Sequence, residues 1–254
     1  MFDIGANLTS SHFSKDLDVV LNDSLKAGVE KICITSSNLD DVKNAKKITE
    51  KYKNLYYSVG FHPHNAKDFK IEFLKDMSVY LNDPKAICLG EMGLDFNRNF
   101  SSKEEQILCF ESQLSLANSI SKPLFLHQRD AHEEFLSVLD NHKFNQKLIV
   151  HCFTGNLSEL EEYLKRDFYI GITGWVCDLK RGKELRECIN QIPEDKLLIE
   201  TDSPYFSPRK KIRMNEPKFL IDVAEEVATL RNETKESIIN SSYENSLNFF
   251  NLHR

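Results

Sequence analysis

Eight short apolar runs, separated by longer charged stretches, constrain the fold of this chain more than any other feature. The runs are rich in Ile, Val, Leu, Tyr and Phe, and they read MFDIGAN, KICITSS, LYYSVGFHPH, AICLGEMGLD, PLFLHQRD, KLIVHCFTG, FYIGITGW and KLLIETDSP. The stretches between them, such as 15–27, 40–53, 103–119 and 156–166, have the periodicity of amphipathic helices. Such alternation is typical of parallel strands joined by right-handed crossovers, so we expect an α/β fold.

Eight βα units in a chain of 254 residues predict a closed TIM-type (β/α)8 barrel. No Pro/Gly/Ser-rich linker and no shift in composition divides the sequence, so we expect one domain over residues 1–254. An open doubly wound sheet is the alternative, but it normally carries a Gly-rich phosphate turn after its first strand, and DIGANLTSS has one Gly. Two extra helices, near 216–231 and 235–250, are expected after the eighth strand.

The charge and cysteine content restrict the partners and the compartment. A net charge of −6 disfavours a protein that coats nucleic acid along its length, but an enzyme that grips a chain end needs only local positive charge. No run of 18 apolar residues predicts a membrane span, and MFDIGANLTS lacks the features of a signal peptide. Six scattered Cys without a CxxC pair indicate reduced thiols. We expect a cytoplasmic protein, and a monomer by default.

Ionisable side chains stand at the carboxyl ends of the expected strands, where the active sites of such barrels lie. In strand order they are His62 and His64, Glu91, His127 and Arg129, His151, and Asp202. Each would cost several kcal/mol if it were buried alone, and a shared divalent cation would compensate them together. Carboxylates and imidazoles suit Zn²⁺, Mn²⁺ or Mg²⁺, whereas a purely structural polar cluster is the alternative. Glu200 is two positions before Asp202, so its side chain is expected on the same face of the strand. There it either orients a metal ligand or belongs to an ion pair inside the barrel.

A cationic loop follows the eighth strand, in SPYFSPRKKIRMNEP. Its cations are Arg209, Lys210, Lys211 and Arg213. Solvated surface is the usual role of such a run, but its place at the catalytic face favours a grip on an anion.

Other residues at this face are candidates to contact the substrate. Arg129 is two positions after His127, so the two side chains are expected on the same face of the strand. Arg129 is suited either to bidentate phosphate binding or to a salt bridge with a neighbouring acid. Trp175 ends the seventh strand and either stacks on a ligand or closes the barrel mouth. The candidate substrate-binding residues are therefore His64, Arg129, Trp175, Arg209 and Arg213.

Five motifs, GEMGLDF, LHQRDAH, HCFTG, LLIETDSPY and NEP, run in order along nearly the whole chain. They resemble the G-E-x-G-L-D, H-x-R-[DE]-A, H-[CS]-F-[TS]-G, L-x-E-T-D-[AS]-P-Y and N-E-P motifs of the TatD-type metal-dependent DNases, a branch of the amidohydrolase-like barrels. The resemblance implies that Glu91, His127, His151 and Asp202 are the metal ligands. It also implies a metal-dependent nuclease, chiefly a 3′→5′ exonuclease on single-stranded DNA or RNA, linked to DNA repair.

The implied cofactor is Mg²⁺, with Mn²⁺ or Zn²⁺ as alternatives, and the candidate catalytic residues are Asp202, Glu91 and His62. Most members of this family begin with D-x-H-x-H, and the two His bind a metal. This chain keeps Asp3 but has Gly5 and Asn7 at the two His positions. We therefore expect one firmly held ion and a second that is weak, supplied with substrate, or absent. His62 is nearest in role to the missing imidazoles.

Two other functions stay open on the sequence alone. The same ligands would polarise a carbonyl as readily as a phosphoryl group, as in the deacylation of D-aminoacyl-tRNA. Alternatively, the barrel has lost catalysis and serves as a binding module. The departure at Gly5 and Asn7 supports that second reading, and the joint presence of the four candidate ligands argues against it.

Overall fold

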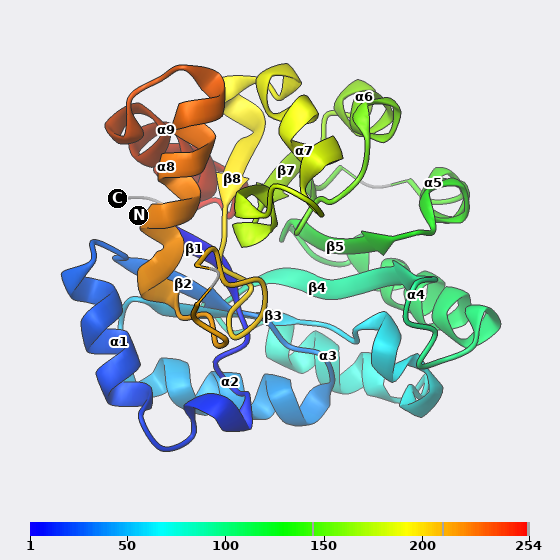
Figure 1. Ribbon diagram of the computed structural model, residues 1–254. Helices are drawn as coiled ribbons and strands as arrows, with labels where there is room; N and C mark the ends of the chain where they lie inside the picture. The colour runs from blue at the N-terminus through cyan, green and yellow to red at the C-terminus, as the bar shows by residue number, and fades with distance from the viewer. Residues whose placement is uncertain (144, 210, 253–254) are drawn as a thin grey trace. The chain divides into compact units, whose positions relative to one another are not determined.

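The computed structural model describes residues 1–143, 145–209 and 211–252 (Figure 1). Among these residues, strands β1 to β8 follow one another in sequence order and alternate with helices, as the sequence predicts. The chain divides into two compact units, residues 1–34 with 151–254 and residues 35–150. None of the described helices is both long and apolar enough to cross a bilayer.

The first unit contains the two ends of the chain. Its strands are β1 (Phe2–Ala6), β2 (Lys31–Ile34), β7 (Tyr169–Ile172) and β8 (Leu197–Ile199). Its α-helices are α1 (Leu17–Lys26), α6 (Leu157–Lys165), α7 (Lys183–Cys188), α8 (Leu220–Arg231) and α9 (Lys235–Phe249). β1 pairs in parallel with β2, β7 pairs in parallel with β8, and a parallel bridge joins Ala6 to Ser203. The helices α8 and α9 contact each other and are the two extra helices expected from the sequence.

The second unit contains the four middle strands. They are β3 (Leu55–Val59), β4 (Ala86–Asp95), β5 (Leu124–Arg129) and β6 (Leu148–Val150), and neighbours pair in parallel. Its α-helices are α2 (Leu39–Lys51), α3 (Phe73–Leu81), α4 (Lys103–Ala117) and α5 (His132–Asp140). All ten residues of β4 are buried, because both faces of a parallel strand in an α/β protein are covered.

Polar caps begin several of the helices that periodicity predicts. The Asn38 side chain accepts a hydrogen bond from the Asp41 N–H at the start of α2, and Asn156 and Thr234 cap α6 and α9 in the same way. α4 begins with a complete capping box between Ser102 and Glu105. Each cap satisfies a backbone N–H that has no partner inside the helix, which stabilises the helix by about 1 kcal/mol.

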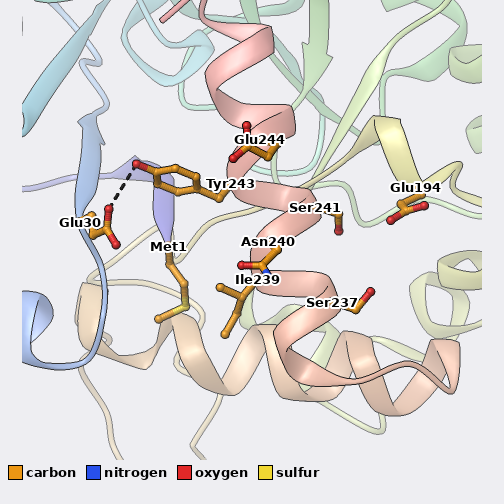
Figure 2. A pocket seen from close by; sticks show the side chains of 9 residues that line it. All are labelled: Met1, Glu30, Glu194, Ser237, Ile239, Asn240, Ser241, Tyr243 and Glu244. Atoms are coloured by element: carbon orange, nitrogen blue, oxygen red, sulfur yellow. Dashed lines mark hydrogen bonds between the residues drawn. The ribbon is translucent and has the colours of Figure 1, made fainter. Parts of the chain in front are cut away.

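A pocket of about 720 Å³ lies beside α9 (Figure 2). It is lined by Met1, Glu30, Glu194, Ser237, Ile239, Asn240, Ser241, Tyr243 and Glu244. Met1 precedes β1 and Glu194 precedes β8, so the pocket lies at the amino ends of these strands. Barrel active sites form at the carboxyl ends, and the three glutamates have the wrong charge for a polyanion. The pocket therefore has neither the position nor the charge of the expected active site.

Gly93 permits the close approach of β4 to β5. In the register of this pair Gly93 lies opposite His127, and a Cβ atom at Gly93 would lie 1.9 Å from the His127 carbonyl oxygen. The φ of Gly93 is +147°, which side-chain-bearing residues rarely adopt. We expect Gly93→Ala to lower the free energy of unfolding, measured by urea denaturation, by about 3 kcal/mol or more.

The control for this prediction is Gly28→Ala. Gly28 also has a positive φ, +87°, but the nearest atom to an added Cβ is the flexible Met1 side chain at 3.8 Å. This variant therefore carries the backbone cost of about 1 kcal/mol without the collision. Equal losses in the two variants would contradict the steric explanation of Gly93.

Candidate active site

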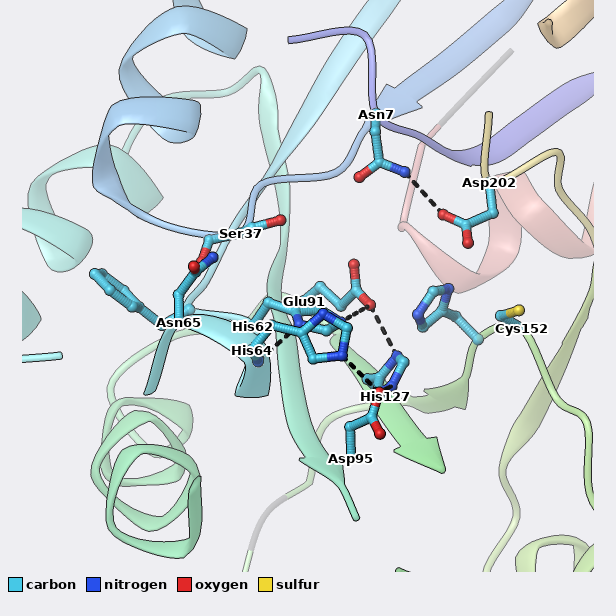
Figure 3. A network of polar contacts seen from close by, with 12 residues as sticks. Asn7, Ser37, His62, His64, Asn65, Glu91, Asp95, His127, Cys152 and Asp202 are labelled. Atoms are coloured by element: carbon cyan, nitrogen blue, oxygen red, sulfur yellow. Dashed lines mark hydrogen bonds and ion pairs between the residues drawn. The ribbon is translucent and has the colours of Figure 1, made fainter. Parts of the chain in front are cut away.

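Glu91 lies between two imidazoles in the unit of residues 35–150 (Figure 3). Its Oε1 is 3.0 Å from His62 Nε2 and 3.0 Å from His127 Nδ1. Glu91 is 4% exposed and comes from β4, whereas His62 follows β3 and His127 lies on β5. Three neighbouring parallel strands thus bring a carboxylate and two imidazoles to one place, with Glu91 and His127 inside β4 and β5 rather than beyond their ends.

Asp95 is a second buried carboxylate, four residues after Glu91 on the same strand. Its Oδ2 accepts a 2.6 Å hydrogen bond from His64 Nε2 and lies 3.5 Å from His127 Nε2. The backbone N–H of Arg98 also donates to this carboxylate. Burial alone would raise the pKa of Asp95, but the neighbouring His127 and His64 imidazoles hold it well below its usual range. Asp95 is therefore ionised at neutral pH.

Asp95 is not among the candidate catalytic, metal-binding or substrate-binding residues predicted from the sequence. The sequence contains one indication of its role. Side chains alternate along a strand, so Asp95, four positions after Glu91, is expected on the same face as Glu91.

His62 is held in one protonation state by its surroundings. Its Nδ1 accepts a 3.0 Å hydrogen bond from the backbone N–H of His64, so the ring proton of the neutral imidazole is on Nε2. Nε2 then donates to Glu91. Burial lowers the pKa of His62 to about 4, even though the neighbouring Glu91 carboxylate opposes that shift. His62 is therefore neutral at pH 7 and is a hydrogen-bond donor to Glu91 in this arrangement.

This cluster has the chemistry of a cation site. One ligand atom from each of His62, Glu91 and His127 can be chosen so that all three lie within 4.8 Å of one another. Buried nitrogen and oxygen donors of this kind fit a divalent ion. His62 Nε2 would first have to lose its proton, so Glu91 and His127 are the better ligands of the three.

Asp202 follows β8 in the other unit, and the first strand holds it. Its Oδ1 accepts a 2.8 Å hydrogen bond from Asn7 Nδ2 (Figure 3). The backbone N–H of Asp202 donates to the Gly5 carbonyl oxygen. Asp202 is 8% exposed and has a φ of +50°, in the left-handed region. The two residues that stand where most TatD-type proteins have histidines thus position Asp202 here, and the Asn7 amide is a donor to its carboxylate.

Glu200 orients His151 within the same unit. His151 Nδ1 is 3.3 Å from Glu200 Oε2, and the Cys152 N–H donates to Glu200 Oε1 at 2.5 Å. Glu200 has no exposed surface, and His151 is 2% exposed. When Nδ1 donates to the carboxylate, Nε2 keeps its lone pair, which is the arrangement that surrounds many metal-binding histidines. The same contact is a buried ion pair, so the geometry agrees with both predicted roles of Glu200.

Asp3 lies behind this site. It accepts hydrogen bonds from the Thr201 hydroxyl at 2.5 Å, the Thr201 N–H at 2.9 Å and the Gly5 N–H at 3.3 Å. Burial raises the pKa of Asp3 to about 7, and the hydrogen bonds from Thr201 oppose that rise. The acid of the opening strand is therefore a link between β1 and the segment after β8.

The remaining substrate-contact candidates have different surroundings. Arg209 makes two hydrogen bonds to Asp222, at 2.9 and 3.0 Å, and its guanidinium lies 4.5 Å from the centre of the Phe219 ring. Arg213 is exposed, and Arg129 is half-buried at the end of β5. Within this loop Lys211 is exposed, and Lys210 lies outside the described residues.

Comparison with known proteins identifies the family. Residues 2–251 match the family described as TatD related DNase. The chain belongs to this family. The resemblance predicted from the five motifs is thus confirmed.

Members of the TatD-related family from enteric bacteria are similar to this chain over most of its length. A protein of Citrobacter koseri named 3'-5' ssDNA/RNA exonuclease TatD is 44% identical over 241 residues, which cover 92% of each chain. A protein of Salmonella typhimurium with the same name is 43% identical over 239 residues, again 92% of each chain.

Solved structures of the family share the fold. A TatD family hydrolase of Entamoeba histolytica is 30% identical, with a TM-score of 0.90 over 98% of this chain and 97% of that one. A TatD homologue of Escherichia coli K12 is 26% identical, with a TM-score of 0.92 over 100% and 98% of the two chains. These likenesses and the strand order confirm the predicted TIM-type (β/α)8 barrel.

Proposed function

We propose that this protein is a divalent-metal-dependent 3′→5′ exonuclease that hydrolyses single-stranded DNA or RNA. The observation that carries the proposal is the buried Glu91 carboxylate, 3.0 Å from an imidazole nitrogen on each side. The names of the similar bacterial proteins supply the substrate and the polarity. Glu91, His127, His151 and Asp202 are the proposed ligands of the ion, with Mg²⁺ as the expected metal.

Each of these residues has its own role in the proposed hydrolysis. A divalent ion held by these ligands supplies Lewis acidity toward a phosphate oxygen and acidifies a bound water. The Asp202 carboxylate, oriented by the Asn7 amide at Oδ1, is proposed to accept the proton of the attacking water. His62 donates from Nε2 to Glu91 and holds that carboxylate in place. The residues proposed to contact the substrate are His64, Arg129, Trp175, Arg209 and Arg213.

The opening strand limits the number of ions. Gly5 has no side chain, and the Asn7 amide donates to Asp202. Neither residue offers a strong ligand, so we propose one firmly held ion and a second that binds weakly or with the substrate. We likewise propose a monomer as the active form and one domain over residues 1–254.

The setting proposed for this activity is DNA repair in the cytoplasm. All six cysteines are free thiols, and five of them are buried, which supports a reducing compartment.

Digestion of an end-labelled single-stranded oligonucleotide tests the proposed function. We expect stepwise loss of nucleotides from the 3′ end with Mg²⁺ or Mn²⁺, and loss of nearly all cleavage in EDTA, because no residue replaces the ion as Lewis acid. Adding back Mn²⁺ should restore the activity. Full cleavage in EDTA would contradict the proposal, and so would hydrolysis of D-aminoacyl-tRNA without any cleavage of oligonucleotides.

A further inference from the structure

Three aromatic side chains meet on the loops that follow β7 and β8, and we call them the aromatic ledge: Trp175, Tyr205 and Phe206. The ring centres of Trp175 and Phe206 are 5.3 Å apart at an interplanar angle of 79°. Tyr205 and Phe206 are 6.5 Å apart at 58°. Tyr205 is 55% exposed, whereas large aromatic side chains in a fold of this size are mostly covered.

Trp175 and the backbones of the two loops are held in place. Trp175 lies in the 3₁₀ helix η3 (Gly174–Cys177), and its Nε1–H donates to the Arg181 carbonyl oxygen at 3.1 Å. The Arg181 guanidinium lies 4.6 Å from the centre of the Trp175 ring. A Cβ atom at Gly174 would lie 2.0 Å from the Phe206 carbonyl oxygen, so the two loops touch through their backbones. A rigid surface loses little conformational entropy when a ligand binds.

The ledge also adjoins the proposed catalytic aspartate. Tyr205 is three residues after Asp202, and its backbone N–H donates to the Asp202 carbonyl oxygen at 2.9 Å. Cations belong to the same loops: the Arg181 side chain is 59% exposed, and Lys211 and Arg213 are exposed. Arg181 is paired with Asp178, so its charge is partly balanced.

Exposed aromatic rings beside cations are the surface that proteins present to single-stranded nucleic acid. Bases stack on the rings, the cations follow the phosphates, and each stacked base contributes about 1–3 kcal/mol. A docking site for an apolar protein segment fits less well, because the cations would be buried without phosphates to pair with.

We propose that the aromatic ledge binds nucleobases of the substrate strand by stacking, with Tyr205 as the exposed ring that contacts a base directly. Trp175 supports the ledge, because the Arg181 guanidinium covers one of its faces. Stacking requires a π-face and no particular base, so the ledge selects base-bearing strands without reading their sequence. This inference rests on the proposed function, since it names the part of the substrate that the site recognises.

Trp175 is the single tryptophan of the chain, so intrinsic fluorescence reports on the ledge directly. The experiment titrates the full-length protein in EDTA, where no hydrolysis occurs, with a single-stranded DNA of mixed sequence. A second titration uses an abasic strand of the same length and charge. We expect the base-bearing strand to quench the fluorescence and to bind about tenfold more tightly or better than the abasic strand.

Variants of Tyr205 identify the ring responsible. Tyr205→Leu should weaken binding of the base-bearing strand about tenfold and leave binding of the abasic strand unchanged, whereas Tyr205→Phe should retain binding of both. Because the side chain is exposed, these variants should unfold at the wild-type temperature. Equal affinity of wild type for the two strands would overturn the proposal, as would equal losses for both strands in Tyr205→Leu.

The test of the aromatic ledge and the test of the nuclease activity can succeed or fail independently. If the metal-loaded protein cleaves oligonucleotides while the ledge does not discriminate bases, the ledge proposal fails and the nuclease proposal stands. If the ledge discriminates bases while the loaded protein cleaves nothing, the ledge proposal stands and the nuclease proposal fails.

Discussion

Glu91→Gln is expected to lower kcat/KM for oligonucleotide cleavage about a thousandfold, which corresponds to about 4 kcal/mol of transition-state stabilisation. The substitution keeps the size of the side chain but removes its charge. Glu91 is buried, lies on β4 and is 3.0 Å from a nitrogen of both His62 and His127. A neutral amide cannot balance a divalent ion, so we expect the affinity for Mn²⁺, measured by calorimetric titration, to fall together with the rate.

The matched control is Glu225→Gln on the exposed face of α8, which should leave rate and Mn²⁺ affinity unchanged. Thermal unfolding in EDTA separates a chemical from a structural effect, because Gln fills the same space as Glu and should keep the fold intact. Activity of Glu91→Gln within tenfold of the wild type would contradict the role of Glu91 as a metal ligand.

Asp3→Asn is expected to change how the stability of the protein depends on pH. The pKa of Asp3 is raised by burial from 3.8 to about 7, so between these values the folded state binds a proton that the unfolded state has lost. The contribution of Asp3 to the free energy of unfolding is therefore fully present below pH 4, and it is lost as the pH rises to 7. The pKa difference corresponds to a loss of up to about 4 kcal/mol.

An Asn at position 3 keeps an oxygen that can accept the N–H groups of Gly5 and Thr201, and it has no proton to lose in this range. Relative to wild type, the variant should gain stability as the pH rises. Urea denaturation in EDTA at pH 4.5 and pH 8 measures the change, and Asp195→Asn at an exposed position is the control. If the difference between wild type and Asp3→Asn were the same at both pH values, Asp3 would be ionised in the folded protein.

Much of the fold follows from local pattern. The alternation of apolar runs with amphipathic stretches predicted the eight strands and the helices between them, because side-chain periodicity depends only on neighbours in sequence. Capping residues such as Asn38 and Ser102 mark helix starts for the same reason. The motifs GEMGLDF and LHQRDAH also point to Glu91 and His127 as candidate ligands, although the structure places both residues inside β4 and β5 rather than after them.

The hydrogen-bond partners of the buried polar residues could not be predicted from local pattern. Periodicity places Asp3 on a face of the first strand, but its acceptor role depends on Thr201, which is 198 positions away. The sequence predicts Asn7 to be a poor metal ligand, whereas only the fold shows its amide donating to Asp202.

The protonation of His62 likewise depends on a backbone N–H that turns back onto its ring, and the exposure of Tyr205 depends on how two loops meet. Hydrogen bonds and burial are set by distances in space. A chain's own pattern therefore predicts which groups are candidates for the site, and tertiary contacts decide the charge, tautomer and orientation of each group.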